Sequence, residues 1–399
     1  MSIMTLVTDE AKCSGCGACM MACPVQAITM EADAFGHPYP RIIEDLCIEC
    51  GKCVSVCDFS KNAENRKPLR AYAAAGKNDT LVKNSASGGV FATLAVEHVA
   101  HGGKVAGAVM DLADGRADVY HLLSDKMEDL RRMQGSKYVQ SEAWRCYRNV
   151  IKSVRAGERV LFSGTPCQVA AVKRLTGNPD NLITVDLVCH GVPSKKMMND
   201  YLSIVAKRFG GKVRQFSFRD KSCAKHYCAR VDIAGKKKGI WLRSHYLSFY
   251  KYFLESEICR ESCYACPYAS LSRVSDITVG DYWGVELFHN VPSGNDWSCV
   301  LVNTGKGNAF LEAYGAGLTL VPTEAEWIAR NNRQLVAPSQ KGNKRKDILQ
   351  NYRKGGYASV EADFMQGFGG VIPFYIKMLK NRYANLKARK VVKNCKYED

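Results

Sequence analysis

The chain has 399 residues, of which 46% are hydrophobic and 24% charged, so it can form a packed core and global disorder is not expected. Its formal charge of +17 suits an acidic partner or an anionic ligand, but no nucleic-acid-binding motif accompanies it, and no nucleic-acid partner is expected. The start of the chain has no secretory signal, and no apolar run could span a bilayer, so we expect a cytoplasmic protein. Eighteen cysteines in such a protein indicate metal binding rather than disulfides.

Two cysteine runs near the N-terminus, CSGCGACMMAC and CIECGKCVSVC, share the spacing C-x2-C-x2-C-x3-C. This spacing is typical of bacterial ferredoxins with two 4Fe-4S clusters, in which the fourth cysteine of each run binds the other cluster. We therefore expect a first set of ligands, Cys13, Cys16, Cys19 and Cys57, and a second set, Cys47, Cys50, Cys53 and Cys23. Zinc commonly takes two C-x2-C pairs, and eight cysteines in two identical runs fit two clusters better.

The pattern along the chain predicts an α+β protein: an N-terminal bacterial-type ferredoxin domain followed by a larger mixed α/β domain that binds flavin. The expected parts are the ferredoxin domain 1–62, a linker 63–80, a catalytic domain 81–330 and a C-terminal extension 331–399 with a basic helix. Strands and helices alternate in the larger domain, which favours partly parallel strands. Strands are expected at 104–110, 159–162, 182–188, 213–218, 226–233, 275–279 and 299–302, and helices at 167–175 and 195–209.

Two loops of the larger domain are candidate cofactor sites. The first, NSASGGVF, places Ser85, Ser87, Gly88 and Gly89 before an apolar helix, where free N–H groups and the helix dipole favour the pyrophosphate of a dinucleotide. An ordinary helix cap with packing glycines is the alternative. The second loop, QGSKYVQS, offers a cation and a ring, because Lys137 and Tyr138 can contact a flavin or its phosphates; a simple turn is the alternative.

Further cysteines follow the strands of this domain. Cys167 stands at the start of a helix in FSGTPCQVA, and Cys189 follows a strand in DLVCHGVPS. Loops after neighbouring parallel strands gather at one edge of a sheet, so these two cysteines are expected to converge. Together with Cys263 and Cys266 of ICRESCYACP they would complete a third 4Fe-4S site, with Cys259 as the alternative fourth ligand. A zinc site is the competing interpretation, since four cysteines also satisfy zinc.

Several polar residues near these motifs have no assigned role from sequence. Asp276 and Asp281 are candidates either for binding a flavin ribityl chain or for capping strand ends. Arg219 can face an anionic cofactor or solvent. His190 is the best candidate for a catalytic acid or base, with a structural histidine as the alternative; the catalytic residues stay unassigned.

The C-terminal tail has Ile376, Leu379, Tyr383 and Leu386 on one face of an expected helix and basic residues on the other. This helix is expected to pack on its own domain rather than to contact a membrane.

The ordered set of motifs, with SDITVGDYWG after the last cysteine pair, resembles the coenzyme F420 hydrogenase/dehydrogenase beta subunit family, in its bacterial members with a fused ferredoxin domain. The resemblance implies a FAD domain with its own 4Fe-4S cluster, in which FAD exchanges hydride with coenzyme F420 and single electrons with the clusters. By position it implies that FAD contacts Ser85, Ser87, Gly88, Gly89, Gly135, Ser136, Lys137 and Tyr138, and that the third cluster is bound by Cys167, Cys189, Cys263 and Cys266.

The sequence leaves two classes of function open. In the first, the protein is a FAD- and iron–sulfur-dependent oxidoreductase that moves electrons between a hydride donor or acceptor, such as coenzyme F420 or an organic substrate, and clusters that lead to a redox partner. In the second, it is a ferredoxin-like electron-transfer subunit with no substrate of its own, which serves a polysaccharide or other biosynthetic pathway.

Overall fold

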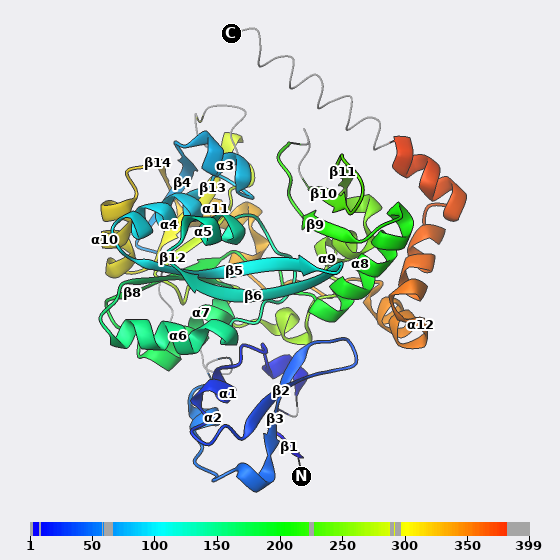
Figure 1. Ribbon diagram of the computed structural model, residues 1–399. Coiled ribbons are helices and arrows are strands. Elements are labelled where there is room, and N and C mark those ends of the chain that lie inside the picture. Colours follow the sequence, from blue (N-terminus) through cyan, green and yellow to red (C-terminus); the bar gives the residue numbers. More distant parts are fainter. Residues whose placement is uncertain are drawn as a thin grey trace.

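The structure is a computed structural model that describes residues 3–7, 9–57, 59, 67–222, 227–287, 291 and 297–380. A small N-terminal domain lies against one side of a larger domain of mixed helices and strands (Figure 1). The α+β fold and the order of its two domains are therefore as predicted from the sequence. Among the described helices, none is both long and apolar enough to cross a membrane.

The N-terminal domain is built on a three-stranded antiparallel sheet with strand order β1-β3-β2. Its strands and short helices are β1 (Ile3–Thr5), η1 (Glu10–Lys12), α1 (Ala18–Ala22), β2 (Ile28–Ala32), β3 (Pro38–Ile43), η2 (Glu44–Leu46) and α2 (Lys52–Ser55). The two α-helices begin after glycines in the left-handed conformation, with φ of 77° at Gly17 and 69° at Gly51. A side chain is strained at such a φ, so these glycines allow the sharp turn from cysteine loop to helix.

The larger domain centres on an eight-stranded sheet with the order β14-β4-β13-β12-β8-β7-β5-β6. Its strands are β4 (Arg70–Gly76), β5 (Lys104–Ala113), β6 (Arg116–Ser124), β7 (Val160–Gly164), β8 (Leu182–Leu187), β12 (Ile277–Asp281), β13 (Ser298–Val302) and β14 (Leu318–Thr323). Strands β5, β7, β8 and β12 run parallel to one another, and the outer pairs are antiparallel. The predicted parallel strands thus form the middle of the sheet.

Helices cover both faces of this sheet (Figure 1). The helices on one face are α4 (Val90–Ala100), α5 (Met127–Met133) and α10 (Gly305–Tyr314), and those on the other face are α6 (Trp144–Arg155) and α7 (Pro166–Thr176). The first face buries apolar side chains such as Leu94 and Leu161, and the second buries Tyr147 and Phe162. Burial of these apolar surfaces is what holds the layers together.

A third apolar core lies beside the large sheet. It joins a small antiparallel sheet with order β11-β10-β9 to helices α8, α9 and α12. These elements are α8 (Lys195–Phe209), β9 (Val213–Ser217), β10 (Cys228–Ile233), β11 (Ile240–Arg243), α9 (Ser248–Leu254) and α12 (Arg345–Gln366). The remaining short helices are α3 (Asp79–Asn84), η3 (Ser244–Tyr246), η4 (Glu261–Ala265), η5 (Val285–Leu287), α11 (Ala325–Asn331) and η6 (Arg333–Leu335).

Two details of the predicted organisation need correction. The expected linker 63–80 is too long, because 70–76 form β4, which pairs with both β13 and β14 inside the large sheet. Its alanines Ala73 and Ala74 are fully buried, and such small side chains give little hydrophobic signal in the sequence.

The second correction concerns the apolar face predicted for the C-terminal helix. In the helix at 371–380, Phe374 and Met378 pack into the core, whereas Ile376 and Leu379 are exposed. Tyr383 and Leu386 lie outside the described residues.

The N-terminal domain shares a core with the larger one. Helix α1 packs against α6 and α7, and Ala18 is buried in the same apolar cluster as Tyr147 and Phe162. A Cβ atom on Gly17 would lie 2.8 Å from Cβ of Trp144. The close contact means that the first cysteine loop is held against the start of α7.

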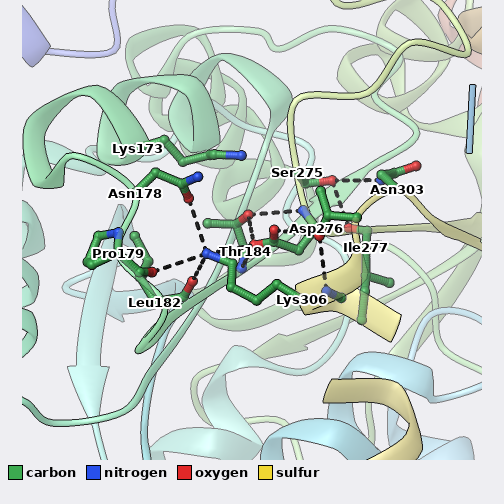
Figure 2. A network of polar contacts seen from close by, with 12 residues as sticks. Lys173, Asn178, Pro179, Leu182, Thr184, Ser275, Asp276, Ile277, Asn303 and Lys306 are labelled. Atoms are coloured by element: carbon green, nitrogen blue, oxygen red, sulfur yellow. Dashed lines mark hydrogen bonds and ion pairs between the residues drawn. The ribbon is translucent and has the colours of Figure 1, made fainter. Parts of the chain in front are cut away.

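A buried polar network fixes the start of β12 against β8 (Figure 2). The carboxylate of Asp276 accepts hydrogen bonds from the backbone N–H of Thr184 at 2.8 Å, from the Thr184 hydroxyl at 2.6 Å and from the Thr304 hydroxyl at 2.9 Å. Lys306 donates to the backbone carbonyl of Leu182 at 2.7 Å. Asp276 therefore anchors strands, which decides between the two roles considered for it.

The Asp276→Ala variant is expected to lower the melting temperature of the holoprotein by roughly 6–12 °C. The reason is that two buried donors of Thr184 and the part-buried hydroxyl of Thr304 lose their acceptor, at a cost of about 3 kcal/mol in free energy of unfolding. Thermal unfolding followed by far-UV circular dichroism measures this, with Asp125→Ala as the control because Asp125 is exposed. Equal melting temperatures for the two variants would contradict the anchoring role.

Candidate functional site

The first set of predicted ligands surrounds one cavity. Cys13, Cys16, Cys19 and Cys57 all line a hollow of about 190 Å³ between the N-terminal helices and the start of α7. Burial, together with smaller contributions from the neighbouring Cys167 and Cys13, raises the pKa of the Cys16 thiol to about 12. A cysteine binds metal as a thiolate. Because these thiols are buried away from water, the positive charge of a bound metal would have to stabilise the thiolate charge.

The second set lies nearer the surface. Cys53 has a raised pKa because of burial, and Cys23 and Cys47 contribute to the shift, which places these three thiols near one another. The Cys23 sulfur accepts a hydrogen bond from the backbone N–H of Ala27 at 3.2 Å. Cys50 is exposed to solvent. The second set therefore has the greater access to a partner molecule.

The members of the third predicted set come from three separate segments, and their thiols lie close enough to influence one another's pKa. Cys167 is the second residue of α7, Cys189 follows β8, and Cys263 lies in η4 with Cys266 directly after it. Burial raises the pKa of all four thiols, and those of Cys189 and Cys263 are raised further by the other members of the set. In Cys167, burial outweighs the hydrogen bond with the Thr165 side chain, and the pKa is raised to about 11.

Cys259 lies at the edge of this third set. It is fully buried and interacts with Cys189 and Cys263. Cys167, by contrast, interacts with Cys189, Cys263 and Cys266. The described cysteines form no disulfide, and no group of three or more His, Cys, Asp and Glu side chains in the described part of the chain is arranged to hold a metal ion.

A second cavity, of about 290 Å³, lies at the carboxyl end of the parallel strands. Seven of the eight residues predicted to contact FAD line it: Ser85, Ser87, Gly89, Gly135, Ser136, Lys137 and Tyr138. The exception is Gly88, whose N–H donates to the Ser298 hydroxyl at 3.0 Å. The N-terminus of α4 follows Gly89, which has a φ of 79° and gives no side-chain cap. The first N–H groups of α4 thus begin at the cavity wall, as an anion site requires.

Charged groups also face this cavity. Arg219 donates to the carboxylate of Asp281 at 2.6 Å, and both residues line the cavity. Lys221, which the sequence places beside Arg219, donates instead to the backbone carbonyls of Val82 and Ser87. Lys137 donates to the carbonyls of Arg132, Gln134 and Gly135, and burial lowers its pKa to about 7.

Sequence reasoning missed one polar group of the cavity. The ring of His121, on β6, is stacked on Phe162 and lies between the Ser163 carbonyl and the Ser141 hydroxyl, at 3.0 Å and 3.1 Å. The Gln168 amide donates to the backbone carbonyl and to the hydroxyl of Ser141. No motif surrounds His121, whereas Gln168 could have been found from the helix start TPCQ, in which its side chain completes a capping box.

His190 is not a good catalytic candidate. Its ring is held by the Ser256 hydroxyl at 2.9 Å and by Gln334 at 3.2 Å, and burial lowers its pKa. It is not among the residues that line the 290 Å³ cavity. The structural role considered for His190 is the one that these contacts favour.

The cysteine sets and the larger cavity form a continuous series. Cys16 of the first set interacts with Cys167 of the third. Thr165 and Gln168, which flank Cys167, and Val188, which precedes Cys189, line the larger cavity. The order of the sites is thus the second set with its exposed Cys50, the first set, the third set and the cavity.

Two regions of the chain match known protein families. Residues 157–325 match the family described as the C terminus of the coenzyme F420 hydrogenase/dehydrogenase beta subunit, and residues 12–61 match the 4Fe-4S dicluster domain. An uncharacterized protein of Methanocaldococcus jannaschii is 26% identical over 216 residues, which are 44% of this chain and 56% of that protein. The coenzyme F420-dependent sulfite reductase of the same organism is 24% identical over 336 residues, 77% of this chain and 46% of the reductase.

Among solved structures, a chain of the F420-reducing [NiFe] hydrogenase complex from Methanosarcina barkeri aligns with a TM-score of 0.47 and 17% identity, over 73% of this chain and 94% of that chain. The chain described here spans about half the length of the curated relatives that it matches.

These findings relate the chain to iron–sulfur electron-transfer proteins. Residues 157–325 match the C-terminal part of coenzyme F420 hydrogenase/dehydrogenase beta subunits, and residues 12–61 match a 4Fe-4S dicluster domain. The family predicted from the ordered motifs is thereby confirmed.

Lowering the pH from 7.5 to 5.5 is expected to destabilise the protein partly through His121, whose pKa burial lowers from 6.5 to about 4. Because the unfolded chain takes up the proton first, this stability is present above pH 6.5 and is lost as the pH falls toward 4. At pH 5.5 the loss is about 1.4 kcal/mol. Melting temperatures at the two pH values should therefore differ less in His121→Gln than in the wild type; an equal difference would show that His121 already carries a proton when folded.

Proposed function

We propose that the protein carries three 4Fe-4S clusters and FAD, and that it moves electrons between a hydride donor or acceptor and a redox partner. The observation that carries the proposal is the series of sites, in which three cysteine sets lead from the surface to a cavity lined by the expected FAD residues. The dicluster match of residues 12–61 supports the first two clusters.

The ligands of the first cluster would be Cys13, Cys16, Cys19 and Cys57, and the shared cavity of about 190 Å³ supports this set. The ligands of the second would be Cys47, Cys50, Cys53 and Cys23, and those of the third Cys167, Cys189, Cys263 and Cys266. We favour Cys167 over Cys259 as the fourth ligand of the third cluster because Cys167 interacts with all three other members of the set.

FAD would occupy the 290 Å³ cavity. The N-terminus of α4, with Ser85, Ser87 and Gly89, would hold its phosphates, and Gly135, Ser136 and Tyr138 would line the rest. The fit is supported by the uncapped helix start and by the guanidinium of Arg219 in the wall. Asp281 holds that guanidinium in place, so the cation is positioned before an anion arrives.

When bound there, FAD would supply the conversion between two-electron hydride chemistry and one-electron transfer. The chain's part is to place the cavity against the third cysteine set, through Thr165 and Gln168 on one side and Val188 on the other. His121, neutral at pH 7, would keep this wall polar without adding charge.

Coenzyme F420 is the proposed hydride carrier, because the family and the sulfite reductase relative are both described by that coenzyme. The proposed outlet for electrons is the second cluster. Cys50 is exposed there, and the neighbouring Ile48 and Val54 are 60% and 66% exposed, which offers a partner an apolar contact close to the cluster.

The second candidate function is that of a relay subunit whose partner performs the substrate chemistry. It is favoured by the description of the matched family as a beta subunit. A relay subunit would accept hydride only in the presence of its partner, whereas a complete enzyme would oxidise reduced F420 alone with an artificial acceptor such as methyl viologen.

The holoprotein, purified anaerobically, is expected to contain about twelve iron atoms and about one FAD per chain, at four irons per cluster. Iron, sulfide and flavin assays with an optical spectrum measure this. Adding reduced F420 should then bleach the visible absorption of flavin and clusters. About eight irons with no flavin would remove the third cluster and the FAD site from the proposal, and a lack of bleaching would favour the relay function.

The Cys167→Ala variant is expected to lose about four iron atoms, because a third-cluster ligand is removed. Cys259→Ala is the matched variant and should keep about twelve. A third variant, Cys146→Ala, controls for removing a buried cysteine, since the Cys146 thiol only donates to the Ala143 carbonyl. Iron loss in Cys259→Ala but not in Cys167→Ala would make Cys259 the fourth ligand instead.

A further inference from the structure

Arg260 is a fully buried arginine at the junction of the two domains. It lies just before η4, between Cys259 and Cys263, and its backbone is fixed because its N–H donates to the Val192 carbonyl at 2.9 Å. Its side chain reaches into the N-terminal domain, where Nε donates to the Cys13 carbonyl at 2.7 Å. The guanidinium carbon lies 4.0 Å from the centre of the Tyr39 ring.

This cation has no carboxylate partner in the described part of the chain. No Asp or Glu oxygen described by the structure lies within 4.0 Å of it, and its Nη2 is buried without a hydrogen-bond acceptor. Three other arginines with buried side chains each have a carboxylate partner: Arg208 pairs with Glu361, Arg219 with Asp281 and Arg273 with Asp186. Arginine does not lose its proton in proteins, so Arg260 stays charged.

His37 and Tyr39, which lie near Arg260, do not balance its charge. Burial lowers the pKa of His37 to about 3, with a further contribution from Arg260, so His37 is neutral at pH 7. Burial raises the pKa of Tyr39, so its phenol stays protonated. A buried charge without a counterion is costly, and an arginine kept in this place implies a negative charge that the described part of the polypeptide does not provide.

The position of Arg260 indicates where that negative charge lies. Its side chain contacts the backbone of Cys13, of the first set, and its backbone carbonyl accepts a hydrogen bond from the N–H of Cys263, of the third set, at 3.0 Å. A Cβ atom on Gly15 would lie 2.8 Å from Nη1, so the first cysteine loop closes directly over the guanidinium. Cluster sites with four thiolates carry net negative charge.

We propose that Arg260 is the buried counter-cation shared by the first and third 4Fe-4S clusters, and that it raises the reduction potential of both. A fixed positive charge stabilises the more negative, reduced form of each cluster, which holds the electron at the domain junction. The inference rests on the proposed function, because it requires the third cluster.

The test compares Arg260→Gln with Arg260→Lys in the anaerobic holoprotein by redox titrations monitored by electron paramagnetic resonance. In Arg260→Gln the equilibrium constant for reducing the first and third clusters should fall at least tenfold, which is about 59 mV for a one-electron step. The second cluster should not change and is the internal control. Arg260→Lys, which keeps the charge, should retain most of the wild-type potential.

The other outcomes are also decisive. Loss of iron in Arg260→Gln with full iron in Arg260→Lys supports the proposal, since the charge is then needed for assembly. Unchanged potentials in Arg260→Gln, equal shifts in both variants, or iron loss in both would overturn it in favour of a purely structural role. A wild-type protein with only about eight irons would mean that the proposed function has failed first.

Discussion

The packing of helix α1 against α6 and α7 is the contact on which the arrangement of sites depends. Ala18 is buried in the core of the larger domain, and Gly17 allows the backbone to approach Trp144 closely. These contacts place Cys16 beside Cys167, so the dicluster domain and the larger domain form one series of sites. Since the interface is apolar and closely packed, it fixes the spacing between sites, which electron transfer between them requires.

The parallel strands in the middle of the sheet place the cysteines of the larger domain beside the larger cavity. The chain leaves β7 and β8 at the same edge, and each connection carries a cysteine next to residues that line the larger cavity. One turn thus serves two sites: Pro166 starts α7, Cys167 faces the cysteine set, and Gln168 completes the helix cap and borders the cavity. Ligand sites at the carboxyl edge of parallel strands are the general expectation for such sheets.

Local signals were enough to predict most of these features. The ferredoxin spacing is contained within short loops, and the helix 195–209 was predicted at its observed bounds because Ser194 caps it and Gly210 ends it. Strand β4 was missed because its alanines are buried only through pairing with distant strands. For the same reason Asp276 and Asp281 looked alike in sequence, although one anchors strands and the other pairs with Arg219 at the cavity.

The buried position of Arg260 and its partners could not be predicted from the sequence. Arg260 stands between Cys259 and Glu261, so it reads as one basic residue of a +17 protein. The structure shows that its partners, Cys13 and Gln140, are more than a hundred residues away, and that no acid among the described residues pairs with its buried charge. Three clusters of net charge roughly −2 each would bring the total to about +11. Part of the positive charge of the chain would then lie inside the protein, at Arg260, where it balances the negative charge of the clusters.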